Sequence, residues 1–380
     1  MDITIRPGKL SGSVNVIPSK SQAHRYLICA ALADQKTTII CPETNQDIEA
    51  TASCLRALGA SIIRMEEGYE VTPISAVPKT VQINCKESGS TLRFLLPIIG
   101  ALGITAAIRM EGRLPQRPLS PLWEEMQRMG CQLSRPVTDT ILCTGKLKPG
   151  HYTIDGGVSS QYISGLLFAL PLIGESHLTV TGKIESQPYI EMTRQALHIF
   201  PDYHSPGTVE VEGDWSNGAF WLAANALGSD LNIGNLCNNS AQGDRESAVL
   251  IPKLQFFSKI DVSNIPDLVP ILAVVASANQ GAQFLNIQRL RLKESDRVAS
   301  TIAMIEILGG KAEADDDTLT VYGTGLHGGT VDACSDHRIA MAAAIASTVC
   351  KAPVTVLGAE CVQKSYPQFW AEFTRLGGKI

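Results

Sequence analysis

Several common functional signatures are missing from this 380-residue sequence. Its ten cysteines contain no C-x-x-C pair and no zinc-binding spacing. The glycine turn at Asp155–Gly157 has neither dinucleotide-binding nor Walker A spacing, so nucleotide binding is not indicated. We therefore expect reduced thiols in a cytoplasmic protein, with no metal and no cofactor.

An excess of one charge and a membrane-spanning stretch are also missing. The 32 Lys and Arg against 37 Asp and Glu give a net charge of −5, which indicates neither a nucleic-acid nor a membrane partner. The uncharged stretch Phe94–Ile108 is too short, and too interrupted by Pro97, to cross a bilayer. The N-terminus lacks the apolar core of a signal peptide. We expect a monomer that binds small-molecule ligands.

The sequence does contain a regular repeat. Polar residues that open short apolar helices occur at positions 21, 90, 160, 216, 267 and 336, which gives steps of 69, 70, 56, 51 and 69. A second series, which precedes amphipathic helices, starts at positions 47, 118, 188, 245, 296 and 367, with steps of 71, 70, 57, 51 and 71. Two series with the same step pattern indicate one structural unit copied six times.

Each repeat is predicted to be a βαβαββ unit. Its first helix is apolar on nearly all faces, as in Ile339–Ala346, and belongs in a core, whereas its second helix is amphipathic. One amphipathic helix is expected over Pro118–Gly130, ending at a Gly. We expect the fold class α/β (α+β), as a two-domain, inside-out α/β barrel with three units per domain. Its fourth and fifth units are expected to be shortened.

Charged residues gather where the helices begin. Lys293-Glu294-Ser295-Asp296-Arg297 follows a segment, Arg289–Leu292, whose alternation predicts a strand with Arg289, Arg291 and Lys293 on one face. Ser335-Asp336-His337-Arg338 places two cations at a helix start, where the dipole opposes them unless an anion binds there. Each segment taken alone is also compatible with a solvated or partly exposed helix cap.

Three further segments indicate a site for anions. Pro18-Ser19-Lys20-Ser21 resembles a phosphate or carboxylate clamp, although Ser21 could equally cap its helix. Gly89 permits a close approach of the backbone to a ligand. Asp267 is either a simple cap or an ionised acceptor that serves as a general base. Helix N-termini bind anions, phosphate above all.

These segments together resemble the enolpyruvyl transferase family, and within it the members that act on shikimate 3-phosphate. The resemblance spans nearly the whole chain in the expected order. It rests on Pro18–Ser21 with Arg25, Gly89-Ser90 with Arg93, Arg117-Pro118, Val158–Gln161, Ser186–Tyr189, Val211–Asp214, Gln242–Asp244, Ile265–Asp267, Lys293–Arg297, Asp336–Arg338 and Lys364–Pro367.

The resemblance implies transfer of enolpyruvyl from phosphoenolpyruvate to the 5-hydroxyl of shikimate 3-phosphate. It implies two closing domains, residues 1–18 plus 213–380 and residues 19–212, with the active site in the cleft between them. The catalytic residues implied are Asp267, Glu294 and Lys20. The shikimate 3-phosphate contacts implied are Lys20, Ser21, Arg25, Ser159, Ser160, Gln161, Ser186, Asp267 and Lys293. The phosphoenolpyruvate contacts implied are Lys20, Gly89, Arg93, Arg117, Gln161, Arg297, His337, Arg338 and Lys364.

The sequence departs from the family pattern at a few positions. Glu87-Ser88 stands before Gly89 where Asn-Ala is more usual, and Phe94 stands where many members carry Pro. We expect Gly89 to leave room for glyphosate beside the phosphoenolpyruvate pocket.

Three alternatives remain. The related transferase that uses UDP-N-acetylglucosamine typically carries a reactive Cys in the loop that here is Met110–Arg117, which has none. A non-catalytic binding protein of the same fold would more naturally have lost Asp267, Glu294 or Lys20. An RNA-end enzyme built on similar units would need a more basic chain.

Overall fold

The computed structural model describes residues 1–380, and the chain divides into two compact units. Unit 1 comprises Met1–Ile17 and Gly213–Ile380, and unit 2 comprises Pro18–Glu212. The chain therefore passes between the units twice, and backbone hydrogen bonds flank these passages. Within unit 2 the Ser19 N–H donates to the Glu212 carbonyl, and within unit 1 the Asp214 N–H donates to the Ile17 carbonyl, both at 2.8 Å.

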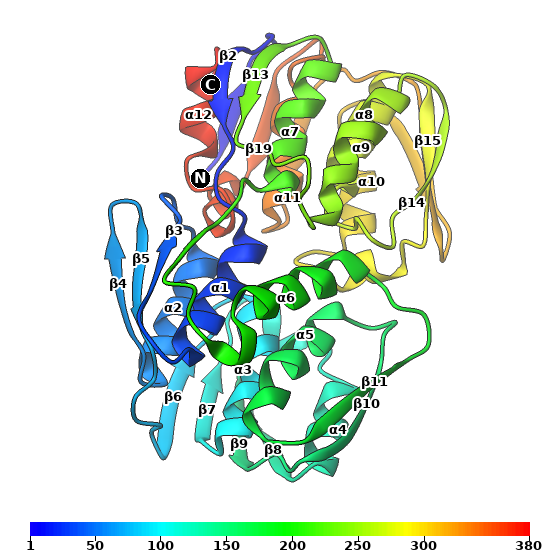
Figure 1. Cartoon of the computed structure of the whole chain (residues 1–380). Coiled ribbons are helices and arrows are strands. Elements are labelled where there is room, and N and C mark those ends of the chain that lie inside the picture. Colours follow the sequence, from blue (N-terminus) through cyan, green and yellow to red (C-terminus); the bar gives the residue numbers. More distant parts are fainter. The chain divides into compact units, whose positions relative to one another are not determined.

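Unit 2 contains six α-helices and ten strands (Figure 1). The helices are α1 (Lys20–Leu32), α2 (Gln46–Ala57), α3 (Gly89–Leu102), α4 (Leu122–Arg128), α5 (Ser160–Ala169) and α6 (Gln187–Ile199). The strands are β3 (Thr37–Ile40), β4 (Ser61–Met65), β5 (Gly68–Thr72), β6 (Thr80–Asn84), β7 (Thr105–Arg109), β8 (Cys131–Val137), β9 (Thr140–Gly145), β10 (Gly150–Asp155), β11 (Ser176–Thr181) and β12 (Thr208–Glu210).

Unit 1 contains six further α-helices and nine strands. The helices are α7 (Trp215–Ala226), α8 (Ser247–Lys253), α9 (Val269–Ala278), α10 (Arg297–Ile307), α11 (His337–Ala346) and α12 (Phe369–Arg375). The strands are β1 (Ile3–Ile5), β2 (Ser11–Asn15), β13 (Asp230–Gly234), β14 (Ser258–Asp261), β15 (Gly281–Leu285), β16 (Lys311–Ala314), β17 (Thr318–Tyr322), β18 (Gly329–Asp332) and β19 (Val354–Leu357).

The strands form six small sheets, three in each unit. Unit 2 has the orders β12-β3-β5-β4, β6-β7-β9-β8 and β10-β11, and unit 1 has β14-β15-β17-β16, β1-β19-β18 and β13-β2. Parallel pairs such as β6 with β7 join strands across a buried helix, and antiparallel pairs such as β8 with β9 form hairpins. The architecture is α/β with many small mixed sheets.

Each unit has its own apolar core, and the helices predicted to be buried lie in it. All ten residues of α11 are buried, as are nine of the ten in α9, from Val269 to Ser277. A helix that is apolar on every face finds no water-facing side, so it is stable only inside a core. In unit 1, α7, α9 and α11 pack against one another. In unit 2, α3 packs on both α1 and α5.

The predicted glycine at the end of the helix before residue 130 is confirmed, but two local predictions are wrong. Gly59, Gly130, Gly309 and Gly377 all adopt positive φ where their helices end. The helix expected from Pro118 begins only at Leu122, after a turn through Pro121. Gln288–Leu292 forms a 3₁₀ helix rather than a strand, so the alternation of Arg289 and Arg291 does not place them on a strand face.

The prediction of a shortened fifth unit is also wrong. The segment around α9 and α10 keeps all four strands, β14 to β17. A hairpin is missing instead after α6 and after α8, where the chain continues directly to β12 and to β14. The short steps of 56 and 51 residues start at positions 160 and 216, so they belong to these two segments.

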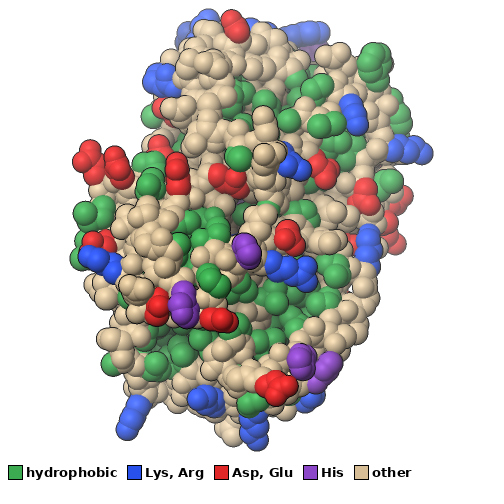
Figure 2. Space-filling model, viewed as in Figure 1, with side chains coloured by type: hydrophobic (Ala, Val, Ile, Leu, Met, Phe, Trp, Pro, Cys, Tyr) green, Lys and Arg blue, Asp and Glu red, His purple; other side chains and the backbone are tan.

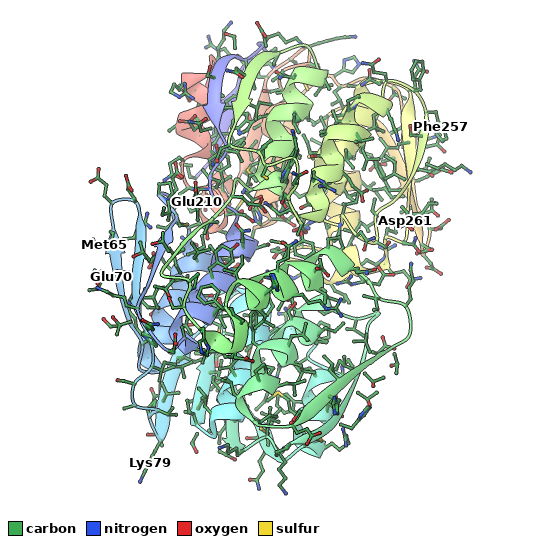
Figure 3. All side chains as sticks on the ribbon, in the orientation of Figure 1. Met65, Glu70, Lys79, Glu210, Phe257 and Asp261 are labelled. Carbon is green, nitrogen blue, oxygen red and sulfur yellow. The ribbon has the colours of Figure 1, made fainter.

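The surface carries mixed charges and scattered apolar side chains. On the face drawn in Figure 2, acidic and basic side chains are interspersed. Phe257, beside β14, and Met65, at the end of β4, both point outward, with 53% and 50% of their surface exposed (Figure 3). None of the helices is both long enough and apolar enough to span a membrane.

Candidate active site

In unit 1, the carboxylate of Asp267 lies among three cationic side chains. Its Oδ1 accepts from Arg297 Nη1 at 2.7 Å and from Lys293 Nζ at 3.3 Å, and its Oδ2 accepts from Arg338 Nη2 at 3.0 Å. Asp267 is not the cap of α9, because Leu268 holds that position without a side-chain bond. The carboxylate is therefore available for the site rather than for the helix.

Arg297, the first residue of α10, is bound by three carboxylates. Besides Asp267 it donates to Glu294 Oε2 at 2.7 Å and, through Nε, to Asp336 Oδ2 at 3.0 Å. The Arg297 side chain is 1% exposed. Burial favours the neutral form of this guanidinium, but the three carboxylates outweigh it and raise its pKa.

Asp336 connects this cluster to α11. It is fully buried, and its Oδ1 caps the helix by accepting from the Arg338 N–H at 3.0 Å. Its Oδ2 also accepts from Ser295 Oγ at 3.0 Å. The neighbouring His337 is 1% exposed. The starts of α10 and α11 and the loop before α9 thus meet at one polar centre inside unit 1.

The charges of this centre set its protonation. Burial pushes the pKa of Asp267 upward, but Arg338, Lys293 and Arg297 outweigh burial and hold it well below its usual range. Burial lowers the pKa of Lys293 to about 8, although Asp267 opposes that change. Asp267 is therefore an ionised acceptor at neutral pH, and Lys293 is a cation that releases its proton readily.

A second carboxyl group lies near this centre. Asp244 is 2% exposed and accepts a hydrogen bond from Ser216 Oγ. Burial, and then the charge of Asp267, raise its pKa to about 7. Asp244 can therefore exchange a proton near neutral pH, whereas Asp267 cannot.

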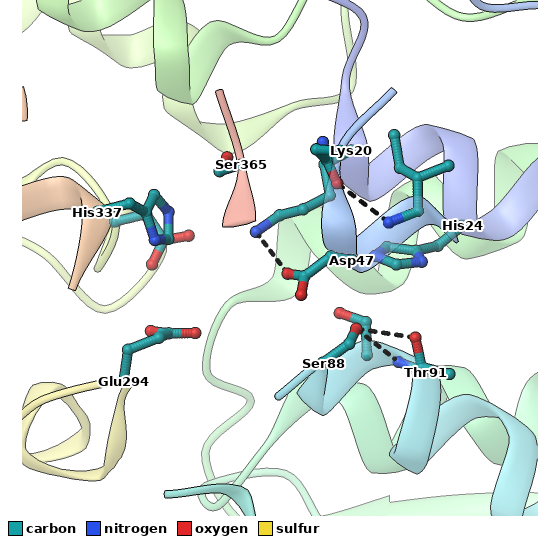
Figure 4. A network of polar contacts seen from close by, with 12 residues as sticks. Lys20, His24, Asp47, Ser88, Thr91, Glu294, His337 and Ser365 are labelled. Atoms are coloured by element: carbon teal, nitrogen blue, oxygen red, sulfur yellow. Dashed lines mark hydrogen bonds and ion pairs between the residues drawn. The ribbon is translucent and has the colours of Figure 1, made fainter. Parts of the chain in front are cut away.

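In unit 2, α1 begins with Lys20 and carries Arg25 five residues later. Lys20 Nζ forms an ion pair with Asp47 Oδ2 at 3.1 Å (Figure 4). Arg25, which is 2% exposed, donates through Nε to Thr193 Oγ1 at 2.9 Å and through Nη1 to the Ser21 carbonyl at 2.5 Å. Burial lowers the pKa of Arg25 to about 10. Ser19, not Ser21, caps this helix.

The start of α3 holds a second cationic group. Arg93 donates to Gln161 Oε1 and to the Pro118 carbonyl, both at 3.0 Å, and Gln161 donates to Ser90 Oγ at 3.0 Å. A methyl group at Gly89 would lie 2.5 Å from Arg93 Nη1 and 2.9 Å from Arg117 Nη1. The absence of a side chain at Gly89 is what lets both guanidinium groups approach this helix start.

The remaining predicted site residues also lie at helix starts, or in a buried short helix. Ser159 caps α5, Ser160 is its first residue, and Ser186 precedes α6 with φ of 54° and 2% exposure. Lys364 ends the 3₁₀ helix Ala359–Lys364 and is 7% exposed. Within unit 2, the structure places together Gly89, Arg93, Arg117 and Gln161. Within unit 1, it places together Asp267, Lys293, Glu294, Arg297 and Arg338.

Three polar residues of these clusters received no site role in the sequence analysis. Asp47 pairs with Lys20, Asp336 binds Arg297, and Asp244 binds Ser216. Each stands beside a helix start in the sequence, which is a usable signal, but a cap and a site carboxylate look the same there. No group of three or more His, Cys, Asp or Glu side chains is arranged to hold a metal ion.

Solved structures give the class of fold. EPSP synthase from Acinetobacter baumannii superimposes with a TM-score of 0.79 at 22% identity, covering 99% of this chain and 98% of that one. The enolpyruvyl transferase NikO from Streptomyces tendae gives a TM-score of 0.70 at 19% identity, covering 99% and 97%. The two-unit α/β fold is therefore that of an enolpyruvyl transferase.

Sequence relatives narrow this class. The family model for EPSP synthase (3-phosphoshikimate 1-carboxyvinyltransferase) matches residues 5–256 and 246–373. The 3-phosphoshikimate 1-carboxyvinyltransferase of Clostridium kluyveri is 37% identical over 416 residues, covering 100% of this chain and 98% of the relative. That of Clostridioides difficile is 35% identical over 428 residues, covering 100% and 98%. The chain belongs to the EPSP synthase family, a family of transferases, and the resemblance found in its sequence is confirmed.

Proposed function

We propose that this chain transfers the enolpyruvyl group of phosphoenolpyruvate to the 5-hydroxyl of shikimate 3-phosphate and releases phosphate. The full-length relatives carry the name of this activity. The observation that carries the proposal inside the structure is the carboxylate of Asp267, which three cations hold ionised. Both substrates are anions, and the two cationic clusters offer the charge that they need.

The reaction consists of an addition and an elimination. In the addition, the 5-hydroxyl oxygen bonds to C2 of phosphoenolpyruvate, its proton passes to a base, and a second proton is added to the methylene carbon C3. In the elimination, C3 returns a proton, the C2–O bond to phosphate breaks, and the C2–C3 double bond forms again. Proton transfers of this kind contribute about 10²–10⁴-fold each.

Asp267 is proposed as the base for the hydroxyl. Its pKa is low while Arg338, Lys293 and Arg297 surround it, so it is a weak base in the substrate-free chain. An anionic substrate that draws Lys293 or Arg338 toward its phosphate removes part of this stabilisation and raises the basicity of Asp267. The same cations then offset the charge of the departing phosphate.

Glu294 and Lys20 are proposed as the groups that exchange protons with C3. Glu294 is held by Arg297 at 2.7 Å, and Lys20 is held by Asp47 at 3.1 Å, so each side chain has a defined direction. Arg25, Ser21, Ser159, Ser160, Gln161, Ser186 and Lys293 are proposed contacts of shikimate 3-phosphate. Gly89, Arg93, Arg117, Gln161, Arg297, His337, Arg338 and Lys364 are proposed contacts of phosphoenolpyruvate.

We infer six related units, three in each half of the chain, arranged as inside-out barrels around α1, α3 and α5 and around α7, α9 and α11. Three small sheets in each unit support this inference. The cleft site, the domain boundaries, the monomeric state and the cytoplasmic location stay predictions. The ten free thiols are what a reducing compartment would leave.

Phosphate release tests the function directly. Phosphoenolpyruvate is supplied with either shikimate 3-phosphate or UDP-N-acetylglucosamine as the acceptor. Release only with shikimate 3-phosphate, lost in Asp267→Ala and Glu294→Gln, supports the proposal. Release only with UDP-N-acetylglucosamine would show that the chain is the related transferase that uses this nucleotide sugar as its acceptor. No release with either acceptor from a folded protein would favour a binding protein that has lost the chemistry.

A further inference from the structure

A buried chain of hydrogen bonds links three helices of unit 2. His24 on α1 contacts Thr51 on α2, with Nδ1 and Oγ1 2.7 Å apart. Thr51 Oγ1 contacts Thr91 Oγ1 on α3 at 2.6 Å, and Thr91 Oγ1 donates to Ser88 Oγ at 2.8 Å. All four side chains are at most 1% exposed. None of the four belongs to the proposed catalytic or substrate-binding residues.

Counting the hydroxyl hydrogens fixes which atom donates and which accepts in each of these hydrogen bonds. A hydroxyl group has one hydrogen to donate. Thr91 uses its hydrogen toward Ser88, so it must accept from Thr51. Thr51 has then used its own hydrogen and must accept from His24. The Nδ1 atom of His24 is therefore the protonated ring nitrogen.

The other ring nitrogen agrees with this assignment. His24 Nε2 is buried and has no hydrogen-bond partner. A bare acceptor is tolerated there more readily than an N–H without an acceptor, because unpaired buried N–H groups are the rarer kind. Burial, together with the charges of Lys20 and Arg25, outweighs Asp47 and lowers the pKa of His24 to about 3, so the ring stays neutral.

The chain of bonds ends beside the cationic group at α3. Ser88 caps that helix, where its Oγ accepts from the Thr91 N–H at 3.3 Å and from Thr91 Oγ1 (Figure 4). Its own hydroxyl hydrogen remains available for donation. Ser88 directly precedes Gly89, against which Arg93 and Arg117 lie. The other end, His24, precedes Arg25 and lies one helical turn after Lys20.

We propose that His24, Thr51, Thr91 and Ser88 form a positioning relay that holds the start of α3 against α1 and α2 and turns the Ser88 hydroxyl into a fixed donor beside Gly89. The occupant of that position is an anionic oxygen, which under the proposed function belongs to phosphoenolpyruvate. The relay does not touch C2 or C3, so it acts on binding of that substrate and not on the chemical steps. The Ser88 side chain is one of the places where the sequence departs from the family pattern.

Kinetics of two matched variants test the relay. Thr51→Val keeps the shape of the side chain but removes the hydroxyl, whereas Thr51→Ser keeps the hydroxyl. We expect Thr51→Val to raise the KM for phosphoenolpyruvate about tenfold, the effect of losing about one hydrogen bond. The KM for shikimate 3-phosphate and kcat should stay unchanged, and Thr51→Ser should behave as wild type. Equal changes in both KM values, or equal effects of Val and Ser, would overturn the proposal.

The ring of His24 supplies a readout that needs no turnover. In ¹⁵N-histidine NMR spectra of the whole chain, the signals lost in His24→Asn identify the two ring nitrogens. We expect protonated Nδ1 and bare Nε2, unchanged between pH 5 and pH 8. A protonated Nε2 would overturn the relay, even in an active enzyme. If wild type shows the expected tautomer but releases no phosphate, the proposed function fails while the relay stands. Titration of wild type and of Thr51→Val with inorganic phosphate then compares their anion binding.

A second pair of variants separates the two ring nitrogens. His24→Asn places an amide donor near the position of Nδ1, whereas His24→Gln places it near Nε2. We expect the Asn variant to retain the low KM for phosphoenolpyruvate and the Gln variant to lose it. The reverse order would show that Nε2 is the functional atom and would contradict the proposed direction.

Discussion

Arg297 Nη1 lies 2.7 Å from Asp267 Oδ1, and this contact joins the first residue of α10 to the loop before α9. The same guanidinium binds Asp336, which caps α11. A cation at a helix N-terminus is opposed by the helix dipole, so Arg297 depends on these carboxylates. These contacts hold the three helix starts in one arrangement. Its carboxylates differ in exposure, so their removal should lower the free energy of unfolding by different amounts.

We predict that Asp267→Asn mainly removes activity. The amide cannot accept the hydroxyl proton, so kcat should fall by about 10²–10⁴-fold. Asp267 is 19% exposed, and Arg297 keeps Glu294 and Asp336 as partners, so the free energy of unfolding should fall less than when a fully buried carboxylate of the same cluster is removed. Phosphate release and urea unfolding measure the two effects. A variant with wild-type kcat would remove Asp267 from the mechanism.

Asp336→Asn is predicted to lower the stability more than Asp267→Asn does. This carboxylate is fully buried, and its removal takes from Arg297 one of its three carboxylate partners and from α11 its charged cap. Breaking a buried ion pair costs about 3–5 kcal/mol, so the urea midpoint should fall far more than in Asp267→Asn. Comparable midpoints for the two variants would contradict the ranking by burial.

Gly89→Ala is predicted to weaken phosphoenolpyruvate binding. The added methyl would lie 2.5 Å from Arg93 Nη1 and 2.9 Å from Arg117 Nη1, so both guanidinium groups must shift. We expect a higher KM for phosphoenolpyruvate, weaker inhibition by glyphosate, and no loss of stability, because Ala is the better helix former. Gly8→Ala is the matched control, since its new methyl would make only ordinary contacts with Lys379. Unchanged kinetics in Gly89→Ala would place phosphoenolpyruvate elsewhere.

Thr193→Val is predicted to act on the other substrate. It removes the hydroxyl that accepts from Arg25 Nε, and Arg25 is the proposed partner of shikimate 3-phosphate. We expect the KM for shikimate 3-phosphate to rise about tenfold while the KM for phosphoenolpyruvate holds, with Thr193→Ser as the control. If the phosphoenolpyruvate KM rises instead, Arg25 has been assigned to the wrong substrate.

Asp244 is predicted to make stability depend on pH. Its pKa is about 7 in the folded chain against a reference of 3.8. Between these values the folded chain holds a proton that the unfolded chain releases, so the contribution of Asp244 to stability falls as the pH rises. Asp244→Asn removes this term. The stability of the variant relative to wild type should therefore increase from pH 5 to pH 7.5.

Two other groups bound the pH window of this test. His24, with a lowered pKa of about 3, adds stability as the pH rises toward its reference value of 6.5, and Lys293 does so only above pH 8. Both remain in wild type and in Asp244→Asn, so the difference between the two proteins isolates Asp244. A difference that does not vary with pH would show that Asp244 is already ionised at pH 5.

Local pattern was enough to predict much of the fold. The alternation of apolar and amphipathic helices could be predicted from the spacing and type of the apolar residues, and the glycine end of the helix before residue 130 and the family motifs could be read directly from the sequence. The errors arose where short-range and long-range preferences differ. The alternation of Arg289 and Arg291 resembles a strand, but in this chain it is a 3₁₀ turn, and the helix expected from Pro118 starts four residues later.

The sequence by itself determined which residues stand at helix starts and that cations gather there. Only the tertiary structure decided which of them meet. Asp267, Arg297 and Asp336 are 30 to 69 residues apart in pairs along the chain, and His24, Thr51 and Thr91 are similarly separated. A carboxylate before a helix can cap it or bind a distant guanidinium. The choice depends on how buried helices pack, because burial raises the cost of leaving any of these charges or hydroxyls without its partner.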